Sequence, residues 1–450
     1  MTKTQTDPNE EFKRAINNEM LDMAQTALKN GADINAHKDM LSEAVLNNNL
    51  EMAKFLVENG FNINANKDTL YRAVLNNNLE MAKFLVENGF NINAHEDTMS
   101  NLAENLLVQE EPLLNFPDTR YMGSKRKLLP SLQGIFEQLN FRTSLDAFSG
   151  TSSVAYLLKS IGKAVDTNDY LMFNYFIAKA LIENNGTTLT EDEIKEICTF
   201  NDDKDSFIEK NFSNIYYSKK DCRWLDSASA NIEFIADPYK KAIALTALCR
   251  ACIKKRPRGI FTYTGMRYDD GRKDLKLELA DHFAEAVRMV NRSIVTSKKK
   301  CIAYNQDIMK FKKTNYDLVY FDPPYFSLKS DNEYSRRYHF LEGLVSYWSH
   351  VQINKETKTK KFDRIESDFT HRNKIVPAFE ALFDKFSESQ IVLSYSSNCF
   401  PDADILKNLL KNAGKAVELI EIDYVYSVGT HSHKKNNESN RVKEYVFLGL

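Results

Sequence analysis

The sequence of 450 residues has few cysteines and no long apolar run. Its six cysteines are scattered along the chain, which argues against a disulfide framework. The longest apolar stretch, around Ala242 to Ile253, is interrupted by Arg250 and is shorter than the roughly 18 residues that a membrane span needs. Residues 1–9 are polar and lack the apolar core of a signal peptide. We therefore expect a cytoplasmic protein without membrane contact.

Clusters of metal-ligating residues are equally scarce. Cys249 and Cys252 have the spacing of half a zinc site, but no second close pair completes it and both lie in an apolar helical run. We expect buried thiols and no bound metal. His431 and His433 share one face of an extended segment without nearby acids or thiols, so phosphate contact or plain solvation is favoured over a metal.

Charge is distributed unevenly along the chain. The formal net charge is −2, but residues 1–110 carry a balance of −8 and the remainder a balance of +6. This pattern is typical of an acidic appendage on a body that binds a polyanion, although +6 over that length is a weak signal by itself.

The acidic N-terminal part is repetitive. Ala44 to Ala65 recurs letter for letter from Ala73 to Ala94, 29 residues later, and a diverged copy precedes them by the same offset. A fixed period in this range predicts stacked helical units, because one unit cannot bury its apolar face alone. The unit resembles the ankyrin repeat, with a shorter period and without the Thr-Pro-Leu-His opening. We predict an all-α, ankyrin-like array over residues 1–105, which serves either as a surface for a protein partner or as a structural cap.

The second domain begins with signals of a parallel sheet. Prolines and acids predict a linker at 106–118, and we place the domain at 119–450. Ser144 to Asp146 predicts a strand that enters a glycine-bearing turn and a helix, and Ala164 to Asp169 predicts a second strand with an acidic end. Such a turn lets the backbone approach a ligand, and the acid can accept from ribose hydroxyls. These two features would suit a dinucleotide enzyme equally well.

A more specific motif follows far downstream. Tyr316 to Phe321 predicts a buried strand that leads directly into Asp322-Pro-Pro-Tyr325. An Asp carboxylate and a proline carbonyl can accept the two N–H bonds of the adenine amine, which favours a pyramidal nitrogen with an available lone pair. The prolines stiffen the turn and add no donor, and Tyr325 offers a face for stacking. An ordinary proline turn is the alternative.

With these motifs in this order, residues 117–450 resemble the Dam-related, alpha-group (class D-twelve) DNA adenine methyltransferases, in the branch that partners type IIS restriction enzymes. The resemblance implies an α/β fold: a Rossmann-like class I sheet with a helical DNA-recognition insert at about 172–300. It also implies transfer of a methyl group from S-adenosyl-L-methionine to the N-6 amine of an adenine flipped out of double-stranded DNA, in or near a restriction-modification system.

The resemblance also implies site residues. The catalytic set is Asp322, Pro323, Pro324 and Tyr325. The cofactor-binding set is Tyr121, Gly123, Lys125, Asp146, Phe148, Ser149, Gly150, Thr151, Asp169, Asp307 and Asp322. For Asp307, a helix N-cap is an equal alternative. Ser152 stands where the family often has a third glycine. We expect this serine to alter the turn without abolishing cofactor binding, because Gly150 is retained.

DNA contact is expected from basic side chains interleaved with aromatics and glycines. A solvated charged loop is the alternative. Residues 326–368 are expected to form a mobile loop that orders on DNA. The expected DNA-binding residues are Lys254, Lys255, Arg256, Arg258, Arg267, Arg336, Arg337, Lys434 and Lys435.

Three other functions are weighed against adenine methylation. N-4 cytosine methyltransferases more often carry Ser in place of Asp322. Carbon-5 cytosine enzymes need a nucleophilic cysteine, usually after proline, and the sequence has no Pro-Cys pair. A repeat-bearing adaptor on an inactive methyltransferase-like domain is disfavoured because Lys125, Asp169 and the Asp322–Tyr325 motif are all retained.

Overall fold

The computed structural model describes residues 7–18, 20–66, 68–75, 79–90, 116–117, 121, 123–202, 205–265, 271–326, 334–425 and 441–450. The chain divides into two compact units, Met1–Leu114 and Asn115–Leu450. Within the described ranges, no helix is long and apolar enough to cross a membrane.

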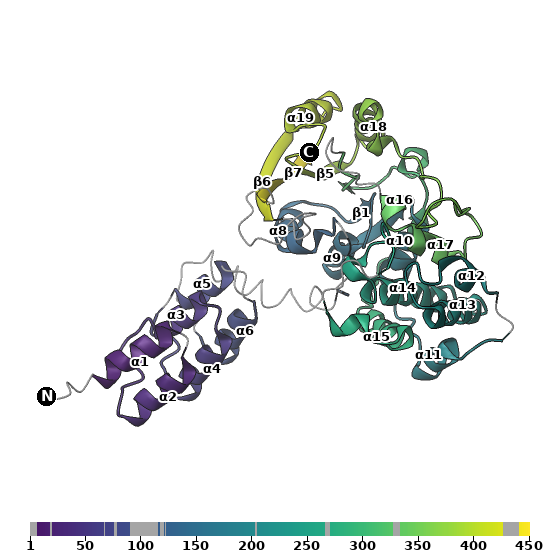
Figure 1. Ribbon diagram of the computed structural model, residues 1–450. Helices are drawn as coiled ribbons and strands as arrows, with labels where there is room; N and C mark the ends of the chain where they lie inside the picture. The colour runs from purple at the N-terminus through teal and green to yellow at the C-terminus, as the bar shows by residue number, and fades with distance from the viewer. Residues whose placement is uncertain are drawn as a thin grey trace. The chain divides into compact units, whose positions relative to one another are not determined.

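The first unit is a stack of helical pairs, as the repeat period predicts. Its odd-numbered helices form one row and its even-numbered helices a second row (Figure 1). Apolar side chains from both rows make one continuous core. The helices are α1 (Pro8–Asn17), α2 (Leu21–Lys29), α3 (Met40–Leu46), α4 (Leu50–Glu58), α5 (Thr69–Leu75) and α6 (Leu79–Glu87).

Asparagines tie neighbouring pairs together. The amide of Asn35 donates to the carbonyl of Gly60 at 3.2 Å, and its side-chain oxygen accepts from the backbone N–H of Asn62 at 2.7 Å. One period later, Asn64 donates to Gly89 at 3.1 Å. The Ile-Asn-Ala segment shared by these repeats is therefore an inter-repeat hydrogen-bond ladder, which satisfies backbone groups that the short loops expose.

The second unit is built on one seven-stranded sheet in the order β3-β2-β1-β4-β5-β7-β6. All its pairings are parallel except those of β7, which runs antiparallel to both β5 and β6. The strand segments predicted from sequence are confirmed. The strands are β1 (Thr143–Asp146), β2 (Ala164–Asp169), β3 (Ala303–Asn305), β4 (Leu318–Phe321), β5 (Gln390–Ser396), β6 (Val417–Val425) and β7 (Arg441–Gly449).

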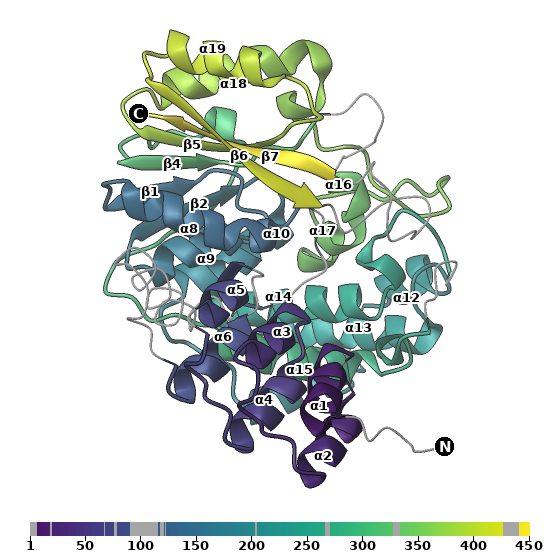
Figure 2. The same ribbon diagram turned by 90° about the vertical axis from the view of Figure 1, so that its left-hand side faces the viewer.

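Helices cover both faces of this sheet. Helices α18 (Arg372–Lys385) and α19 (Ala403–Asn412) lie on one face and pack on the apolar side chains of β1, β4 and β5. Helices α8 (Leu129–Gln138), α9 (Ser153–Ser160) and α10 (Met172–Ala178) lie on the other face (Figure 2). Strand order reverses between β1 and β4, and ligands of such sheets bind at the carboxyl edge of that switch point.

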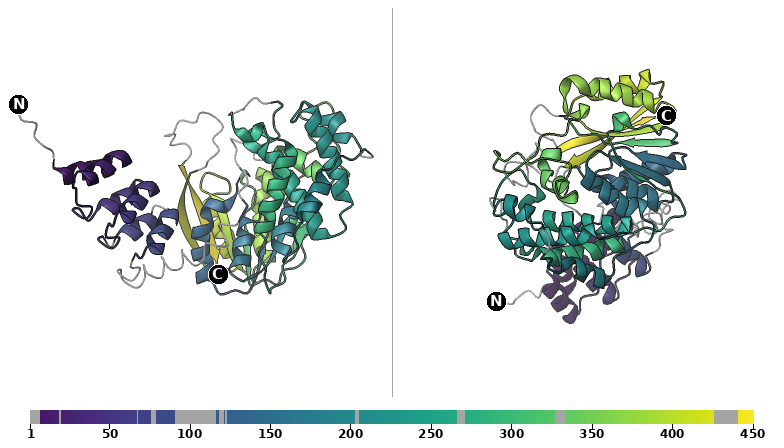
Figure 3. Two further views of the ribbon diagram at one scale, coloured as in Figure 1. Left: turned by 90° about the horizontal axis from the view of Figure 1, so that it is seen from below. Right: turned by 90° about the vertical axis from the view of Figure 1, so that its right-hand side faces the viewer.

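The long insert between the two halves is helical, which confirms the prediction for residues 172–300. Its helices gather beside α10 and away from α18 and α19 (Figure 3). Cys249 and Cys252 lie buried in α14, as expected. After α10 the insert continues through η3 (Lys179–Glu183), α11 (Glu191–Cys198), α12 (Phe207–Phe212), α13 (Lys219–Glu233), α14 (Pro238–Lys254) and α15 (Leu279–Arg292).

The expectation of one mobile loop over residues 326–368 is wrong for much of that range. Residues 334–345 form two helices, α16 (Tyr334–Arg337) and α17 (His339–Val345), and every residue of α17 is buried. Phe340 stacks on Phe261 of the insert and packs edge-on against Trp348. This aromatic packing anchors the segment independently of DNA.

The turn between β1 and α9 carries a strained residue. Ser152 is the N-cap of α9 and has left-handed backbone angles, φ 62° and ψ 24°. Its buried hydroxyl has no hydrogen-bond partner among the described residues. A side chain with a Cβ pays about 1–2 kcal/mol in this region of φ/ψ space, which explains why glycine suits the position.

We predict that Ser152→Gly raises the free energy of unfolding by about 1 kcal/mol, because glycine removes that strain. Denaturant unfolding followed by tryptophan fluorescence measures this unit, since the two tryptophans of the chain, Trp224 and Trp348, both lie in it. Ser153→Gly is the control: Ser153 is helical, so glycine there should lower the stability. A Ser152→Gly chain no more stable than the wild type would contradict the strain argument.

Candidate active site

The first wall of the site is the turn that follows β1. Strand β1 ends at Asp146, and Phe148 to Thr151 then form the turn that leads into α9. Gly150 has φ 49°, a conformation that L-residues rarely adopt. The Asp146 carboxylate is buried; one oxygen accepts from the backbone N–H of Ala155 at 3.2 Å. The other oxygen has no hydrogen-bond partner within the described residues.

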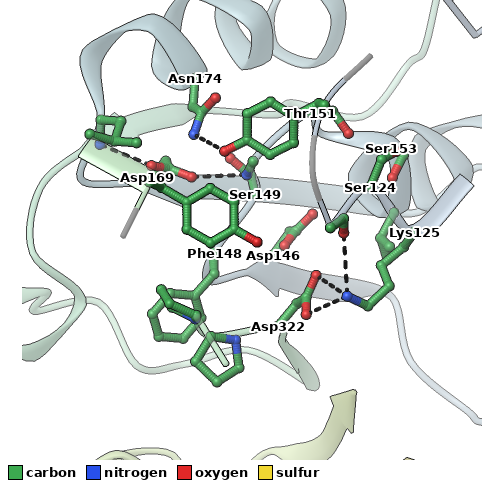
Figure 4. Close-up of a pocket in the computed structure, with 18 of the residues that line it drawn as sticks. Ser124, Lys125, Asp146, Phe148, Ser149, Thr151, Ser153, Asp169, Asn174 and Asp322 are labelled. Carbon is green, nitrogen blue, oxygen red and sulfur yellow. Dashed lines mark hydrogen bonds and ion pairs between the residues drawn. The ribbon is translucent and has the colours of Figure 1, made fainter. Parts of the chain in front are cut away.

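The end of β2 places a second acid beside that turn. One oxygen of Asp169 accepts from the N–H of Gly150 and the other from that of Leu171, both at 2.9 Å. Asp169 therefore ties the glycine turn to the start of α10 (Figure 4). This pairing follows from register, because β1 and β2 are adjacent and parallel.

The segment before α8 supplies the third wall. Gly123 has φ 79°, and a Cβ there would lie 2.5 Å from the hydroxyl of Tyr334, so this position requires glycine. The ring of Tyr121 stacks on Tyr338 with 4.8 Å between centroids and an interplanar angle of 7°. The hydroxyl of Tyr121 accepts from the amide of Asn174 at 3.2 Å.

Lys125 begins the short helix η2 (Lys125–Leu128) and meets the end of β4. Its ammonium donates to both oxygens of Asp322, at 2.6 and 2.7 Å (Figure 4). It also lies 3.6 Å from Glu444 on β7 and 4.9 Å from the ring centroid of Tyr325. The hydroxyl of Tyr325 donates to Glu444. One cation and two carboxylates from three distant segments thus meet at the sheet edge.

These walls line one pocket at the carboxyl edge of the sheet. The structure brings together every sequence-predicted catalytic and cofactor residue except Asp307. Asp307 is exposed, does not line the pocket, and caps the 3-10 helix η6 (Ile308–Lys310) by accepting from Met309 N–H at 3.0 Å. For this residue the structure shows the N-cap alternative.

Burial dominates the electrostatics of the three acids. Desolvation, with a smaller contribution from the charge of the nearby Asp322, raises the pKa of Asp146 to about 8. Desolvation raises the pKa of Asp169 to about 6, against hydrogen bonds from Leu171 and Gly150. It also raises the pKa of Asp322 to about 6, where Lys125 opposes the shift and Glu444 adds to it. Such shifts are typical of sites built to hold a ligand.

The residues of this site that sequence reasoning missed include Asn174, Tyr334 and Glu444. Asn174 and Tyr334 line the pocket, and nothing in their local sequence distinguishes them. Glu444 carries a weak signal, because it is an acid directly before the apolar run Tyr445 to Leu448 at the end of the chain. A buried charge in a strand requires a partner, but the sequence does not say which.

The prediction that Arg256 contacts DNA is contradicted. Its side chain is fully buried, and its guanidinium donates to the carbonyls of Gly265 at 2.7 Å, Ile260 at 3.2 Å and Tyr263. It also packs over the ring of Tyr216. Arg256 therefore shapes the loop from inside, since an extended basic stretch can turn one cation inward to satisfy loop carbonyls.

The other predicted DNA-binding residues differ in exposure. Lys255 is largely buried and pairs with Asp221 at 2.8 Å, whereas Lys254 is 43% exposed. Arg258, Arg336 and Arg337 are at least partly exposed. The N–H of Phe261 donates to the carbonyl of Arg337 at 3.0 Å, so the two basic segments are neighbours. Arg267, Lys434 and Lys435 lie outside the described residues.

The sheet order, the antiparallel β7 and the acid-lined pocket at the switch point define a Rossmann-like methyltransferase domain. Residues 121–428 match the model of the D12 class N6 adenine-specific DNA methyltransferases. The chain belongs to this family. Residues 12–96 match ankyrin repeats in three copies.

Individual relatives agree with the family assignment. The type II methyltransferase M2.HphI of Haemophilus parahaemolyticus is 30% identical over 72% of this chain and 96% of its own length. The modification methylase StsI of Streptococcus sanguinis is 29% identical over 73% of the chain. M.FokI of Planomicrobium okeanokoites is 25% identical over 73%. The chain spans about half the length of these last two, 51% and 52%.

These matches confirm the expected class of enzyme, an adenine-specific DNA methyltransferase with relatives in restriction-modification systems. They do not favour the N-4 cytosine enzyme or the inactive adaptor. DNA is the substrate that the family implies, and ankyrin repeats are associated with protein interaction.

The raised pKa of Asp146 predicts how stability depends on pH. Because the folded pKa, about 8, exceeds the unfolded value, the folded chain binds the proton more tightly and loses stability as pH rises through 8. We expect the free energy of unfolding, without ligand, to fall by at least about 1 kcal/mol from pH 6.5 to 8.5. Asp146→Asn should remove most of this loss.

Denaturant unfolding at the two pH values measures the effect. In this window Asp169 and Asp322, with pKa values about 6, are already mostly ionised. Lys159, whose pKa burial lowers to about 8, opposes the loss equally in both chains, so the difference between the wild type and Asp146→Asn reports Asp146. Asp404→Asn, at an exposed position in the first turn of α19, is the matched control and should keep the wild-type pH dependence. An equal loss in Asp146→Asn and the wild type would show that Asp146 is ionised in the folded chain.

Proposed function

We propose that the pocket binds S-adenosyl-L-methionine and that Asp322 to Tyr325 hold the adenine that is methylated. The observation that carries the proposal is the Asp322 carboxylate, which directly follows β4 and lies in the same pocket as the glycine turn and Asp169. A donor site and an acceptor site must adjoin for methyl transfer, because the reacting atoms need to lie about 3–3.5 Å apart.

The donor side of the pocket suits this ligand. Oxygens of Asp146, Ser149 and Asn174 are buried without a hydrogen-bond partner among the described residues, so they can accept from a ligand rich in donors. When bound, S-adenosyl-L-methionine supplies an electrophilic methyl group on a cationic sulfonium, and buried carboxylates favour a cation.

Asp169 is proposed to hold the ribose hydroxyls. Each oxygen of Asp169 accepts one backbone N–H, from Gly150 or Leu171. A carboxylate offers about four lone-pair sites, so Asp169 keeps the capacity to accept from a nucleoside. The same two backbone contacts orient the carboxylate before any ligand arrives, which lowers the entropy cost of binding.

On the acceptor side, Asp322 is proposed to accept an N–H of the flipped adenine. Its remaining lone pairs face a pocket that also contains Pro323, Pro324 and Tyr325. The ring of Tyr325 packs edge-on against Tyr395, 5.0 Å away, and its hydroxyl is held by Glu444. A ring fixed at both ends is a rigid platform for stacking, which is worth about 1–3 kcal/mol per base.

For DNA recognition we propose that Lys254, Arg258, Arg336 and Arg337 contact the backbone of double-stranded DNA near the pocket. Their support is partial exposure and the hydrogen bond that joins the two segments. Arg256 acts indirectly by holding the loop. By analogy with its relatives, the enzyme is proposed to protect sites in a restriction-modification system.

Residues 1–105 are proposed to form a separate protein-binding array, joined through a linker at 106–118 to the methyltransferase domain at 119–450. The support is the independent core of the repeats and their match to ankyrin. The excess of acidic residues in this part of the chain disfavours DNA as its ligand.

The two sides of the pocket can be separated by a reciprocal pair of substitutions. We expect Asp322→Ala to lower turnover at least about a hundredfold, comparable to the loss of one preorganised partner of the transition state, while DNA affinity holds. Asp169→Ala should instead weaken S-adenosyl-L-methionine affinity, measured by calorimetry, by about 1.5–3 kcal/mol, the range for hydrogen bonds to a charged group. Near-normal turnover in Asp322→Ala would overturn the catalytic proposal.

The proposed independence of the repeats is tested by removing them. A chain that begins at Glu111 should methylate mixed-sequence DNA at a rate within about twofold of the full chain, because every residue that lines the pocket lies downstream. The amount of N6-methyl-2′-deoxyadenosine released by nuclease digestion of the DNA measures the rate. A folded, inactive truncated chain would place the repeats within the active unit.

A further inference from the structure

Glu444 is the part of the pocket cluster to which neither the sequence motifs nor the family assigns a task. It lies near the middle of β7, opposite Ser396 of β5 and Ile422 of β6. Its side chain is 1% exposed. A carboxylate buried this deeply in a sheet is costly unless it is paired.

The two partners of Glu444 among the described residues, Tyr325 and Lys125, both belong to the proposed site. The hydroxyl of Tyr325 donates to one carboxylate oxygen, and the ammonium of Lys125 lies 3.6 Å from that oxygen. Lys125 lies closer to Asp322, at 2.6 Å. The charge of the Lys125 ammonium is therefore shared unequally between the carboxylates of Asp322 and Glu444. Glu444 also holds the ring of Tyr325.

We infer that Glu444 is a positioning residue for methyl transfer: it draws part of the Lys125 charge away from Asp322 and fixes the ring of Tyr325. This inference rests on the proposed role of Asp322. A carboxylate fully neutralised by a bidentate ammonium is a weak acceptor, whereas one that shares the ammonium keeps more of its charge for the adenine amine. Glu444 thus keeps Asp322 a strong hydrogen-bond acceptor, while Lys125 keeps the carboxyl group of Asp322 ionised.

The charge state of Asp322 reports this arrangement, so every group that faces it matters. From its own strand and loop these are Tyr320 and Tyr325, and from the packed elements they are Lys125, Asp146, Tyr334 and Glu444. Lys125 and the Tyr325 hydroxyl lower the pKa of Asp322, whereas Glu444 raises it. Substitutions at Glu444 and Tyr325 therefore move this pKa in opposite directions, which a general loss of structure cannot do.

The experiment measures the pH profile of single-turnover methylation for the full chain and its variants on mixed-sequence DNA. Glu444→Gln keeps the volume and an acceptor for Tyr325 but removes the charge. We expect its plateau rate to fall about five- to tenfold, the equivalent of one hydrogen bond, and the acidic limb of its profile to move down by about one pH unit. Tyr325→Phe should move the acidic limb to higher pH, because the Tyr325 hydroxyl lowers the pKa of Asp322.

Three further arms complete the test. Glu444→Asp keeps the charge and should hold the limb near its wild-type position. Glu421→Gln, on an exposed acid of the neighbouring strand β6 that pairs with Lys443, should change neither rate nor limb. Affinity for S-adenosyl-L-methionine, measured by calorimetry, should be unchanged in Glu444→Gln, because Glu444 does not line the pocket.

The outcomes separate this inference from the proposed function. A Glu444→Gln limb that stays in place, or that moves in the same direction as in Tyr325→Phe, overturns the inference. A Glu444→Asp limb displaced by a full pH unit from the wild type also overturns it, and this comparison holds even if Glu444→Gln does not fold. If Asp322→Ala is inactive while these limbs stay put, the proposed function stands and the role of Glu444 alone fails. If Asp322→Ala is active, both fail.

Discussion

The ammonium of Lys125 is buried at the carboxyl edge of the sheet, and the neutralisation of its charge constrains the rest of the domain. Its partners, Asp322 and Glu444, come from the middle and the end of the chain. Removing one partner of such a buried pair typically costs about 3–5 kcal/mol, because the other charge is left without compensation. The contact requires that β4, β5 and β7 be neighbours, with β7 antiparallel, and this is the order that the sheet adopts. The charge cluster of the pocket therefore depends on the same strand neighbours as the sheet.

A second buried network joins the helical insert to this pocket. The hydroxyl of Tyr216 hydrogen-bonds His339 and the carbonyls of Phe261 and Thr359, at 2.8 to 3.0 Å. Burial lowers the pKa of His339 to about 3, so this histidine is neutral and works as a structural group. On the same helix, Glu342 accepts from the first N–H groups of α10. Helix α17 and its N-cap Tyr338 thus contact three parts of the domain: the loop proposed to bind DNA, the ring of Tyr121 and the start of α10.

The residues around the pocket also lower the stability of the domain. Asp146, Asp169 and Asp322 all have raised pKa values because they are buried, and Ser152 holds a left-handed backbone. A fold selected for stability alone would replace such features, and their concentration at one edge of the sheet is what a ligand site predicts. A bound cation that pairs with these carboxylates would restore part of the lost stability.

The sequence by itself determined the features that depend on local order along the chain. The 29-residue period dictated the paired helices of the array, and the hydrophobic runs before Asp146, Asp169 and Asp322 dictated strands whose acids share one edge. Other features depended on which distant segments become neighbours. Glu444 reaches Lys125 only through the order β4-β5-β7, Arg256 turns inward because loop carbonyls need donors, and residues 339–345 form a helix because aromatic side chains of the insert cover it. Hydrophobic periodicity reports a residue's own element, whereas the partner of a buried charge is set by long-range packing, which the tertiary structure alone decided.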